Sequence, residues 1–299
     1  MSGRPVALGD PAPWYGGATT AHATCVLAPN PSPMTLDGTN TWLLRDGDDV
    51  AVIDPGPDDP RHLDAIEAAL EGAQVTRVLL THGHPDHSDG AAAFARRVGA
   101  PVLALDPAHR LGTEGLVDGD TIDVGGLHLE VVATPGHTGD SLSFLLVEDA
   151  ALLTGDTVLG RGSTVVAHPD GRLGDYLGSL RRLRSLAEST SAAVVLPGHG
   201  PALLSPVDVV TAYLAHREER LDQVRASLDR LGVDASAASG AIDAGPGVDW
   251  WHSREHAEPD VADRVVADVY ADVPRAVWPA ARLSVLAQLA YLRDSTQDR

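Results

Sequence analysis

The stretch RVLLTHGHPDHSDG, residues 77–90, decides the fold of this chain. It begins as an apolar run typical of a buried strand and then places His82, His84, Asp86 and His87 within six positions. Neutral imidazole and carboxylate are the usual protein ligands of zinc and similar divalent ions, and a single loop brings their donor atoms to one point. A merely solvated polar loop does not need this set. The sequence therefore predicts a metal site where a strand ends.

Three later motifs also place a histidine or an aspartate at a strand end or in a tight turn. They are TPGHTGD with His137, LTGD with Asp156 and LPGHG with His199. Taken singly, each has a structural explanation, since an aspartate stabilises turns and a lone histidine often pairs with the backbone. Together with the first cluster they make seven candidate donors at strand ends, and this repetition favours one shared metal site.

The segments around these motifs alternate between strand and helix patterns. Residues 39–54 predict a hairpin with Asp46 and Gly47 at its turn and Asp54 at its end, and residues 58–73 predict an amphipathic helix. Residues 82–90 are rich in glycine and proline, so we expect an irregular loop there before a helix that starts near Gly90. Further strands are predicted at 101–105, 121–124, 127–134, 141–148, 150–156 and 192–200, with a helix at 175–188.

The length of 299 residues exceeds that at which a single core usually stops growing, so we expect two domains. From about Ser205 amphipathic helices dominate, and residues 236–250 are predicted as a glycine-rich loop between them. The helices are predicted at 206–231, 260–270 and 280–292. The predicted division is an N-terminal extension (1–19), a catalytic domain (20–205) and a helical domain (206–299).

The composition limits location and partners. Cys25 is the only cysteine, which excludes an intramolecular disulfide and a cysteine-rich zinc site. A formal net charge of -20 repels phosphate backbones at long range and weighs against nucleic acid. No run reaches the roughly 18 apolar residues that a membrane span requires, and the N-terminus lacks the pattern of a signal peptide. We therefore expect no membrane association and a cytoplasmic location, while the sequence carries no indication of oligomeric state.

The seven-donor pattern resembles that of the metallo-β-lactamase superfamily over roughly residues 20–205. The resemblance implies an α/β fold, a four-layer αββα sandwich with the metal site at one edge of two sheets. It also implies two divalent ions as cofactors, zinc or alternatively Mn²⁺ or Fe²⁺. By this resemblance, the first ion would be held by His82, His84 and His137, the second by Asp86, His87 and His199, and both by a bridging Asp156.

Four further features resemble the lactamase-beta-like protein 2 subgroup: GTNTWLL (38–44), IDPG (53–56), GDTVLG (155–160) and the helical tail. That subgroup carries a small winged-helix-like C-terminal domain. Here the tail stops soon after YLRDSTQDR, which leaves little chain for a β-hairpin wing. The ligand set is also similar to that of glyoxalase II, a thioester hydrolase, although its glutathione-binding region does not align here. True β-lactamases of this pattern carry a cysteine where this chain has Asp156.

The ligand set implies a hydrolase. Two ions would lower the pKa of a shared water and hold a bridging hydroxide, which would attack an ester or thioester bond of a small-molecule or carrier-linked substrate. Besides the bridging Asp156, Asp86 is expected to be catalytic by orienting this hydroxide. Asp54 is a candidate hydrogen-bond partner of a ligating imidazole. His168, between the strand of Asp156 and the next helix, is a candidate substrate-binding residue.

Three other functions remain open. The subgroup permits an endoribonuclease, with RNA as partner and Arg181, Arg182 and Arg184 as a phosphate-facing cluster. A sulfur dioxygenase uses related ligands with a single iron, and a non-enzymatic module would use the helical tail to bind partners. RNA cleavage that falls steeply with salt, one iron per chain, or inactivity with every metal would each indicate one of these functions.

Overall fold

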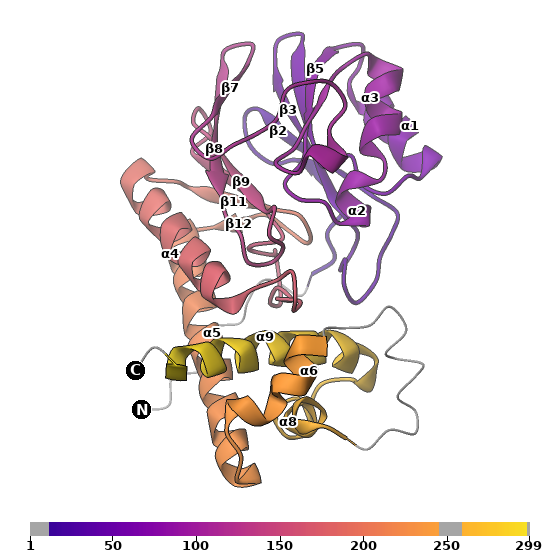
Figure 1. The fold of residues 1–299 in the computed structure, drawn as a ribbon. Helices are drawn as coiled ribbons and strands as arrows, with labels where there is room; N and C mark the ends of the chain where they lie inside the picture. Colours follow the sequence, from indigo (N-terminus) through magenta and orange to yellow (C-terminus); the bar gives the residue numbers. More distant parts are fainter. Residues whose placement is uncertain (1–11, 245–258, 298–299) are drawn as a thin grey trace. The chain divides into compact units, whose positions relative to one another are not determined.

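The computed structural model describes residues 12–244 and 259–297, and the chain divides into two compact units (Figure 1). The first unit comprises residues 1–134, 140–164 and 179–212, and the second comprises residues 135–139, 165–178 and 213–299. His137 and His168 therefore belong to the second unit, and the remaining candidate ligands belong to the first. The boundaries predicted after residues 19 and 205 stay predictions.

The first unit contains both β-sheets and the helices that cover them. Its strands are β1 (Gly17–Ala18), β2 (Ala23–Leu27), β3 (Asn40–Asp46), β4 (Asp49–Ile53), β5 (Gln74–Leu79), β6 (Val102–Leu103), β7 (Thr121–Val124), β8 (Leu127–Ala133), β9 (Leu142–Leu146), β10 (Ala151–Gly155), β11 (Val194–Pro197) and β12 (Leu203–Leu204). Its helices are α1 (Pro60–Ala69), α2 (Pro85–Ser88), α3 (Ala91–Val98) and the short η1 (Pro107–His109), together with the later turns of α4 (Leu173–Thr190).

The strands form two six-stranded mixed sheets. The first has the order β1-β2-β3-β4-β5-β6 and the second has the order β12-β11-β10-β9-β8-β7. The predicted hairpin is confirmed as β3 and β4, with Trp42 opposite Ile53. β4 runs parallel to β5, and β10 runs parallel to β11. Because parallel neighbours end at the same edge of a sheet, the residues that follow each pair lie close together.

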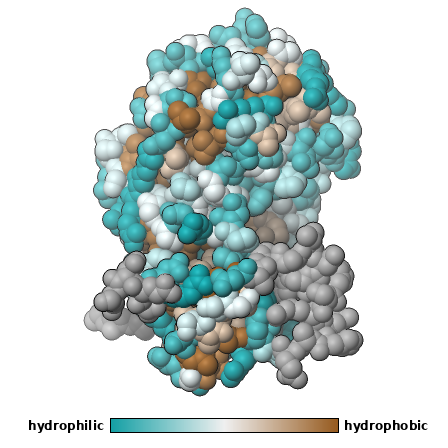
Figure 2. All heavy atoms as spheres, in the orientation of Figure 1, coloured by the Kyte–Doolittle hydropathy of each residue, from teal (hydrophilic) through white to brown (hydrophobic). Residues whose placement is uncertain are grey.

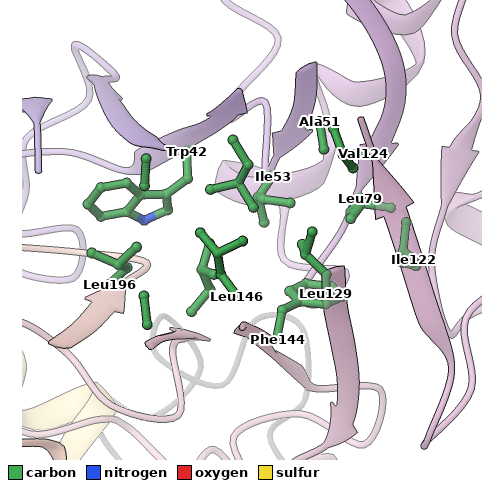
Figure 3. Packing of buried hydrophobic residues seen from close by; sticks show 14 of the residues in the cluster. Trp42, Ala51, Ile53, Leu79, Ile122, Val124, Leu129, Phe144, Leu146 and Leu196 are labelled. Carbon is green, nitrogen blue, oxygen red and sulfur yellow. The ribbon is translucent and has the colours of Figure 1, made fainter. Parts of the chain in front are cut away.

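Alternate residues of the central strands face two different layers. In β4, Ala51 and Ile53 lie in the core between the sheets, whereas Val50 and Val52 pack with the residues of α1 and α3. This period of two is that of a strand buried on both faces. Figure 3 shows the core between the sheets, where apolar side chains of the first sheet, such as Ile53, point toward those of the second, such as Leu146.

Helices cover the outer faces of both sheets. α1 begins at Pro60, after Asp59 has capped the amide of Arg61, and it buries Leu63 and Ile66 against the first sheet. Each buried side chain of this size stabilises the fold by about 1.5–3 kcal/mol. On the second sheet, Leu145 and Leu152 pack against Ala187 of α4. The predicted four-layer αββα sandwich is confirmed.

The second unit is mainly helical. Its C-terminal helices are α5 (Pro206–Leu231), which starts in the first unit, η2 (Ala235–Ala238), α6 (Ser239–Ala244), α8 (Val261–Val269), η3 (Arg275–Val277) and α9 (Trp278–Gln297). Asp260 and Asp263 form a reciprocal capping box at the start of α8. No β-strand occurs within residues 206–244 and 259–297.

The helices predicted at 206–231, 260–270 and 280–292 are confirmed as α5, α8 and α9. The loop predicted over 236–250 is wrong for its described part, because η2 and α6 occupy residues 235–244. The physical reason is the spacing of Ala235, Ala238 and Ile242, which buries all three on one helical face. Residues 245–250 of that prediction lie outside the described residues.

Hydrophilic residues, drawn in teal, cover most of the face shown in Figure 2, with apolar residues between them. The large apolar side chains exposed in the described chain are separate in sequence: Tyr15, Met34, Val117, Val147 and Leu204. None of the helices that the structure describes is both long and apolar enough to cross a membrane.

Candidate metal centre

The candidate ligands of the first unit follow the ends of parallel strands. Asp54 comes directly after β4, and Thr81 and His82 follow β5. In the second sheet, Asp156 follows β10 and His199 follows β11. Each pair of neighbouring strands therefore delivers polar side chains to one sheet edge, as the sequence pattern predicted.

Helix α2 carries two further candidates, Asp86 and His87. The irregular loop predicted for residues 82–90 is wrong at Pro85–Ser88, which form one helical turn. Proline favours this turn because its fixed φ suits the first helical position, where its missing N–H costs nothing. The amide of His87 donates to the carbonyl of His84, which closes the turn.

Two imidazoles and two carboxylates converge on one point. Nε2 of His87 lies 3.3 Å from Nε2 of His199. Nε2 of His199 also lies 3.3 Å from Oδ2 of Asp86 and 3.3 Å from Oδ2 of Asp156. Nε2 of His87 lies 3.4 Å from Asp86 and 3.5 Å from Asp156. Donor atoms about 3 Å apart are those that surround an ion with ligand distances of about 2.0–2.2 Å.

His82 and His84 form the adjoining part of the centre. Nε2 of His82 lies 2.9 Å from Nδ1 of His84, and the ring centroids of His82 and His87 are 4.3 Å apart. His82, His87 and Asp156 also offer ligand atoms that all lie within 4.8 Å of one another. Asp156 is thus next to both parts of the centre, which is the position that a bridging ligand needs.

The second ring nitrogen of the buried imidazoles is committed to a hydrogen bond. Nδ1 of His87 lies 2.9 Å from Oδ2 of Asp54, and Nδ1 of His199 lies 3.1 Å from the carbonyl oxygen of Gly38. Carboxylate and carbonyl oxygens only accept, so both Nδ1 atoms carry a proton, and each ring in its neutral form presents a bare Nε2 to the centre. Two such lone pairs 3.3 Å apart repel each other unless a proton or a metal cation lies between them. The donor set therefore fits a divalent ion.

Asp54 supports the site through hydrogen bonds to the residues that carry or orient the imidazoles. It comes directly after β4 and has a φ of 51°, in the left-handed region that aspartate adopts more readily than most residues. Its Oδ1 accepts the amide of Thr81 at 2.8 Å, and its Oδ2 accepts the Thr81 hydroxyl at 2.6 Å. Since that hydroxyl has given its proton to Asp54, its oxygen accepts from Nδ1 of His82 at 3.0 Å. Asp54 therefore orients His87 directly and His82 through Thr81.

Sequence reasoning missed Thr81 and three other supporting residues. Thr39 donates to Oδ2 of Asp86 at 3.0 Å. The Asn40 amide donates to the carbonyls of Pro197 and Gly200 at 2.9 and 2.8 Å, which fixes the turn that carries His199. A Cβ on Gly198 would lie 2.4 Å from Oδ1 of Asp156. In the sequence, Thr39 and Asn40 stood out only as the polar start of GTNTWLL, and Gly198 only as the glycine of LPGHG.

The carboxylates make the centre favour positive charge. Burial lowers the pKa of His199, but Asp156 and Asp86 outweigh it and raise that pKa to about 9. Burial likewise opposes protonation of His87, yet the same two carboxylates hold its pKa well above the ordinary value. Burial would raise the pKa of Asp156, but His199 and His87 keep it well below the usual range. If both rings were protonated, two positively charged imidazolium groups would repel each other at 3.3 Å, whereas one divalent ion can accept the lone pairs of both Nε2 atoms.

The two remaining candidates lie in the second unit. Nδ1 of His137 donates to the carbonyl of Val165 at 2.7 Å, the arrangement already seen at His87 and His199. Its part in holding the first ion stays a prediction. Nε2 of His168 lies 2.8 Å from the carbonyl oxygen of Ile242 in α6, which gives this ring a structural partner. A role for His168 in substrate binding also stays a prediction.

The arginine cluster considered for RNA lies on α4. Arg182 pairs with Asp118 at 2.7 Å and donates to the carbonyl of Ala133, and Arg184 lies 3.9 Å from Glu188. Two of the three guanidinium groups therefore face carboxylates or backbone of the same unit. This arrangement does not single out a phosphate site.

A sandwich of two packed sheets with imidazoles and carboxylates gathered at one edge defines a class of hydrolases that use metal ions. The chain belongs to the metallo-beta-lactamase superfamily, which residues 34–199 match. Residues 262–295 match the beta-lactamase associated winged helix domain. The predicted superfamily and the winged-helix-like character of the C-terminal domain are thus confirmed.

Several relatives are similar over most of the chain. The atrochrysone carboxyl ACP thioesterase of Aspergillus fumigatus is 34% identical over 260 residues, which are 83% of this chain and 78% of that protein. A beta-lactamase-like protein 2 homolog of Caenorhabditis elegans is 34% identical over 207 residues, 66% of this chain and 68% of that protein. The predicted resemblance to that subgroup is confirmed.

Solved structures share the fold. A beta-lactamase domain protein of Burkholderia ambifaria superposes with a TM-score of 0.73 at 22% identity, over 96% of this chain and 91% of that chain. The di-iron-bound form of TTHA1623 is 28% identical, with a TM-score of 0.50 over 62% of this chain and 96% of that chain.

Proposed function

We propose that this protein is a dinuclear metal-dependent hydrolase that cleaves an ester or thioester bond. The observation that carries the proposal is the convergence of two Nε2 atoms and two carboxylates on one point. Two divalent ions bound here would lower the pKa of a shared water toward ~7, supply a bridging hydroxide and polarise the carbonyl under attack. Nitrogen and oxygen donors of this kind suit zinc, with Mn²⁺ or Fe²⁺ as alternatives. The di-iron form of a structural relative supports a pair of ions.

The proposed ligands are those of the family pattern. They are His82, His84 and His137 for one ion, Asp86, His87 and His199 for the other, and Asp156 for both. Asp54 accepts a hydrogen bond from Nδ1 of His87, and Thr81 accepts one from Nδ1 of His82. Both bonds keep a proton on Nδ1, so that Nε2 is available to a metal ion.

Asp86 is the carboxylate best placed to act on the attacking water. Its side chain is 28% exposed, whereas that of Asp156 is 10% exposed, so Asp86 is the more accessible of the two carboxylates. Thr39 donates to its Oδ2 at 3.0 Å and fixes its rotamer. Held in this way, the carboxylate accepts a hydrogen bond from the water and orients its lone pair toward the substrate carbonyl.

The substrate class that we favour is an acyl group joined to a carrier through a thioester. Two relatives named as thioesterases, one of them acting on a carboxyl ACP, support this choice. The formal charge of -20 and the paired arginines of α4 disfavour a long polyanion such as RNA.

The test combines metal quantification with a substrate panel of acyl thioesters, esters, lactones and RNA. We expect two metal ions per chain and thioester hydrolysis that Asp156→Ala abolishes, together with reduced metal content and an unchanged circular dichroism spectrum. Asp123→Ala is the matched control, because this carboxylate is 74% exposed on β7 and should not affect turnover. Full activity of Asp156→Ala, a single iron per chain, or cleavage of RNA without any thioester would each overturn the proposal.

A further inference from the structure

We propose that Asp106, His109 and Asp140 form a third cation site, beside the dinuclear centre and built from none of its ligands. Each of the three offers one ligand atom, and these atoms all lie within 4.8 Å of one another. All three side chains are partly exposed and belong to the first unit. Two carboxylate oxygens and one imidazole nitrogen suit a divalent ion such as Mn²⁺ or Zn²⁺.

The spacing of these donors suits an ion more than an internal ion pair. His109 forms no ion pair and no ring hydrogen bond with any residue in the described part of the chain, although two carboxylates are its neighbours. Metal–oxygen distances of about 2.1–2.6 Å place ligands on opposite sides of an ion about 4–5 Å apart. The three groups are therefore close enough to share a cation, and neither carboxylate lies close enough to His109 to form an ion pair with it.

Gly83 supplies an independent reason to expect a site here. A Cβ at this position would lie 2.4 Å from Nε2 of His109 and 3.2 Å from Oδ2 of Asp140. The φ of Gly83 is outside the left-handed region, so the backbone alone does not demand glycine. Glycine instead leaves room for two donors to approach the backbone between His82 and His84. The loop that carries the first ligands thus also forms one wall of the third site.

The segment that presents Asp106 and His109 is ordered before any ion binds. Oδ1 of Asp106 caps η1 by accepting the amide of Ala108 at 2.8 Å, which leaves Oδ2 outside the cap. Nε of Arg110 donates to the carbonyl of Ala104 at 2.9 Å and so fixes the base of the turn. Little rearrangement is needed for binding, but partial exposure should make this site weaker than the dinuclear centre.

The test is a Mn²⁺ titration of the full-length protein after removal of bound metal with a chelator. Free and bound Mn²⁺ are separated by their electron paramagnetic resonance signals, and total metal is quantified. We expect two tight equivalents and a third, weaker one. Asp106→Asn and His109→Ala should each remove only the third equivalent. Asparagine still caps Ala108, so a loss in that variant reports on the ligand charge and not on the turn.

The matched control is His128→Ala, which removes an exposed histidine that lies within 4.0 Å of Asp123 and pairs with Glu148. It should keep all three equivalents. A wild-type protein that binds two ions at every Mn²⁺ concentration overturns the proposal, as does a third equivalent that survives both variants or disappears in His128→Ala. The tight equivalents report on the proposed function and the weak one on this site, so the two proposals fail separately.

Discussion

Replacing Thr81 by valine tests how the centre holds its imidazoles. Valine has nearly the same shape as threonine, and the amide of residue 81 still donates to Oδ1 of Asp54. The change therefore removes only two hydrogen bonds, from Thr81 to Oδ2 of Asp54 at 2.6 Å and from His82 to Thr81 at 3.0 Å. Thr81 is 2% exposed, so water does not take the place of the hydroxyl.

The magnitude follows from these two bonds. A hydrogen bond to a charged group contributes about 1.5–3 kcal/mol, and a buried donor left without an acceptor costs about 1–3 kcal/mol. We expect the free energy of unfolding of the metal-free protein to fall by about 3 kcal/mol. Without its acceptor, Nδ1 of His82 no longer fixes the tautomer that leaves Nε2 bare. Loss of such a partner lowers metal affinity by about 10–100-fold.

Chelator competition with zinc measures the affinity, and urea denaturation of the metal-free protein measures the stability. The matched control is Thr76→Val, on the same strand β5, where the hydroxyl donates to the carbonyl of Val50 at 3.2 Å and to none of the candidate ligands. This control should leave zinc affinity unchanged. A Thr81→Val protein with the zinc affinity of the wild type would refute the claim that Thr81 sets the tautomer of His82.

Three further changes test other parts of the molecule. Gly198→Ala places a Cβ 2.4 Å from Oδ1 of Asp156, so we expect loss of bound metal and of turnover with an unchanged circular dichroism spectrum; a fully loaded, active variant would contradict this close approach. Burial lowers the pKa of His62 from 6.5 to about 4, so between these pH values the unfolded chain binds a proton that the folded protein does not, and stability falls as the pH drops. In metal-free protein, urea denaturation at pH 6.5 and pH 4 should show that His62→Gln reduces this loss by about 3 kcal/mol, and an equal loss in both proteins would disprove it. Removing metal should leave the sheets folded but lower the Tm, and zinc at about 100 times its Kd should restore about 2.7 kcal/mol per site, seen by calorimetry; an unchanged Tm would mean that no ion binds the folded protein.

Short-range patterns were sufficient to predict the hairpin and most of the strands, whereas the four-layer sandwich was implied by the family resemblance. In β4 alternate apolar residues serve the two faces of one strand, and Asp46 and Gly47 mark the turn before it. The candidate donors were visible for a related reason, since each motif that carries them comes shortly after an apolar run. A strand that ends in His or Asp is a local feature and needs no knowledge of the partner strand.

The supporting residues were not visible because their partners are distant in sequence. Thr81 bonds to Asp54, 27 positions away, and Asn40 bonds to carbonyls 157 and 160 positions away. Neither side chain has a local pattern that distinguishes it from an ordinary strand residue. The helical turn at Pro85–Ser88 was missed because glycine and proline were read as loop formers, although proline also starts helices.

Several departures from local rules gather at the candidate metal centre. Asp54 has a positive φ, Gly198 leaves no room for a side chain, and His87 and His199 are almost fully buried beside carboxylates. Buried ionic groups are often replaced by apolar residues at no loss of stability, so folding alone does not explain their presence. The apolar core between the sheets lies elsewhere and is complete without them. A centre that the apolar core does not need, yet whose rings are oriented by hydrogen bonds, supports the proposal that these rings bind a cation.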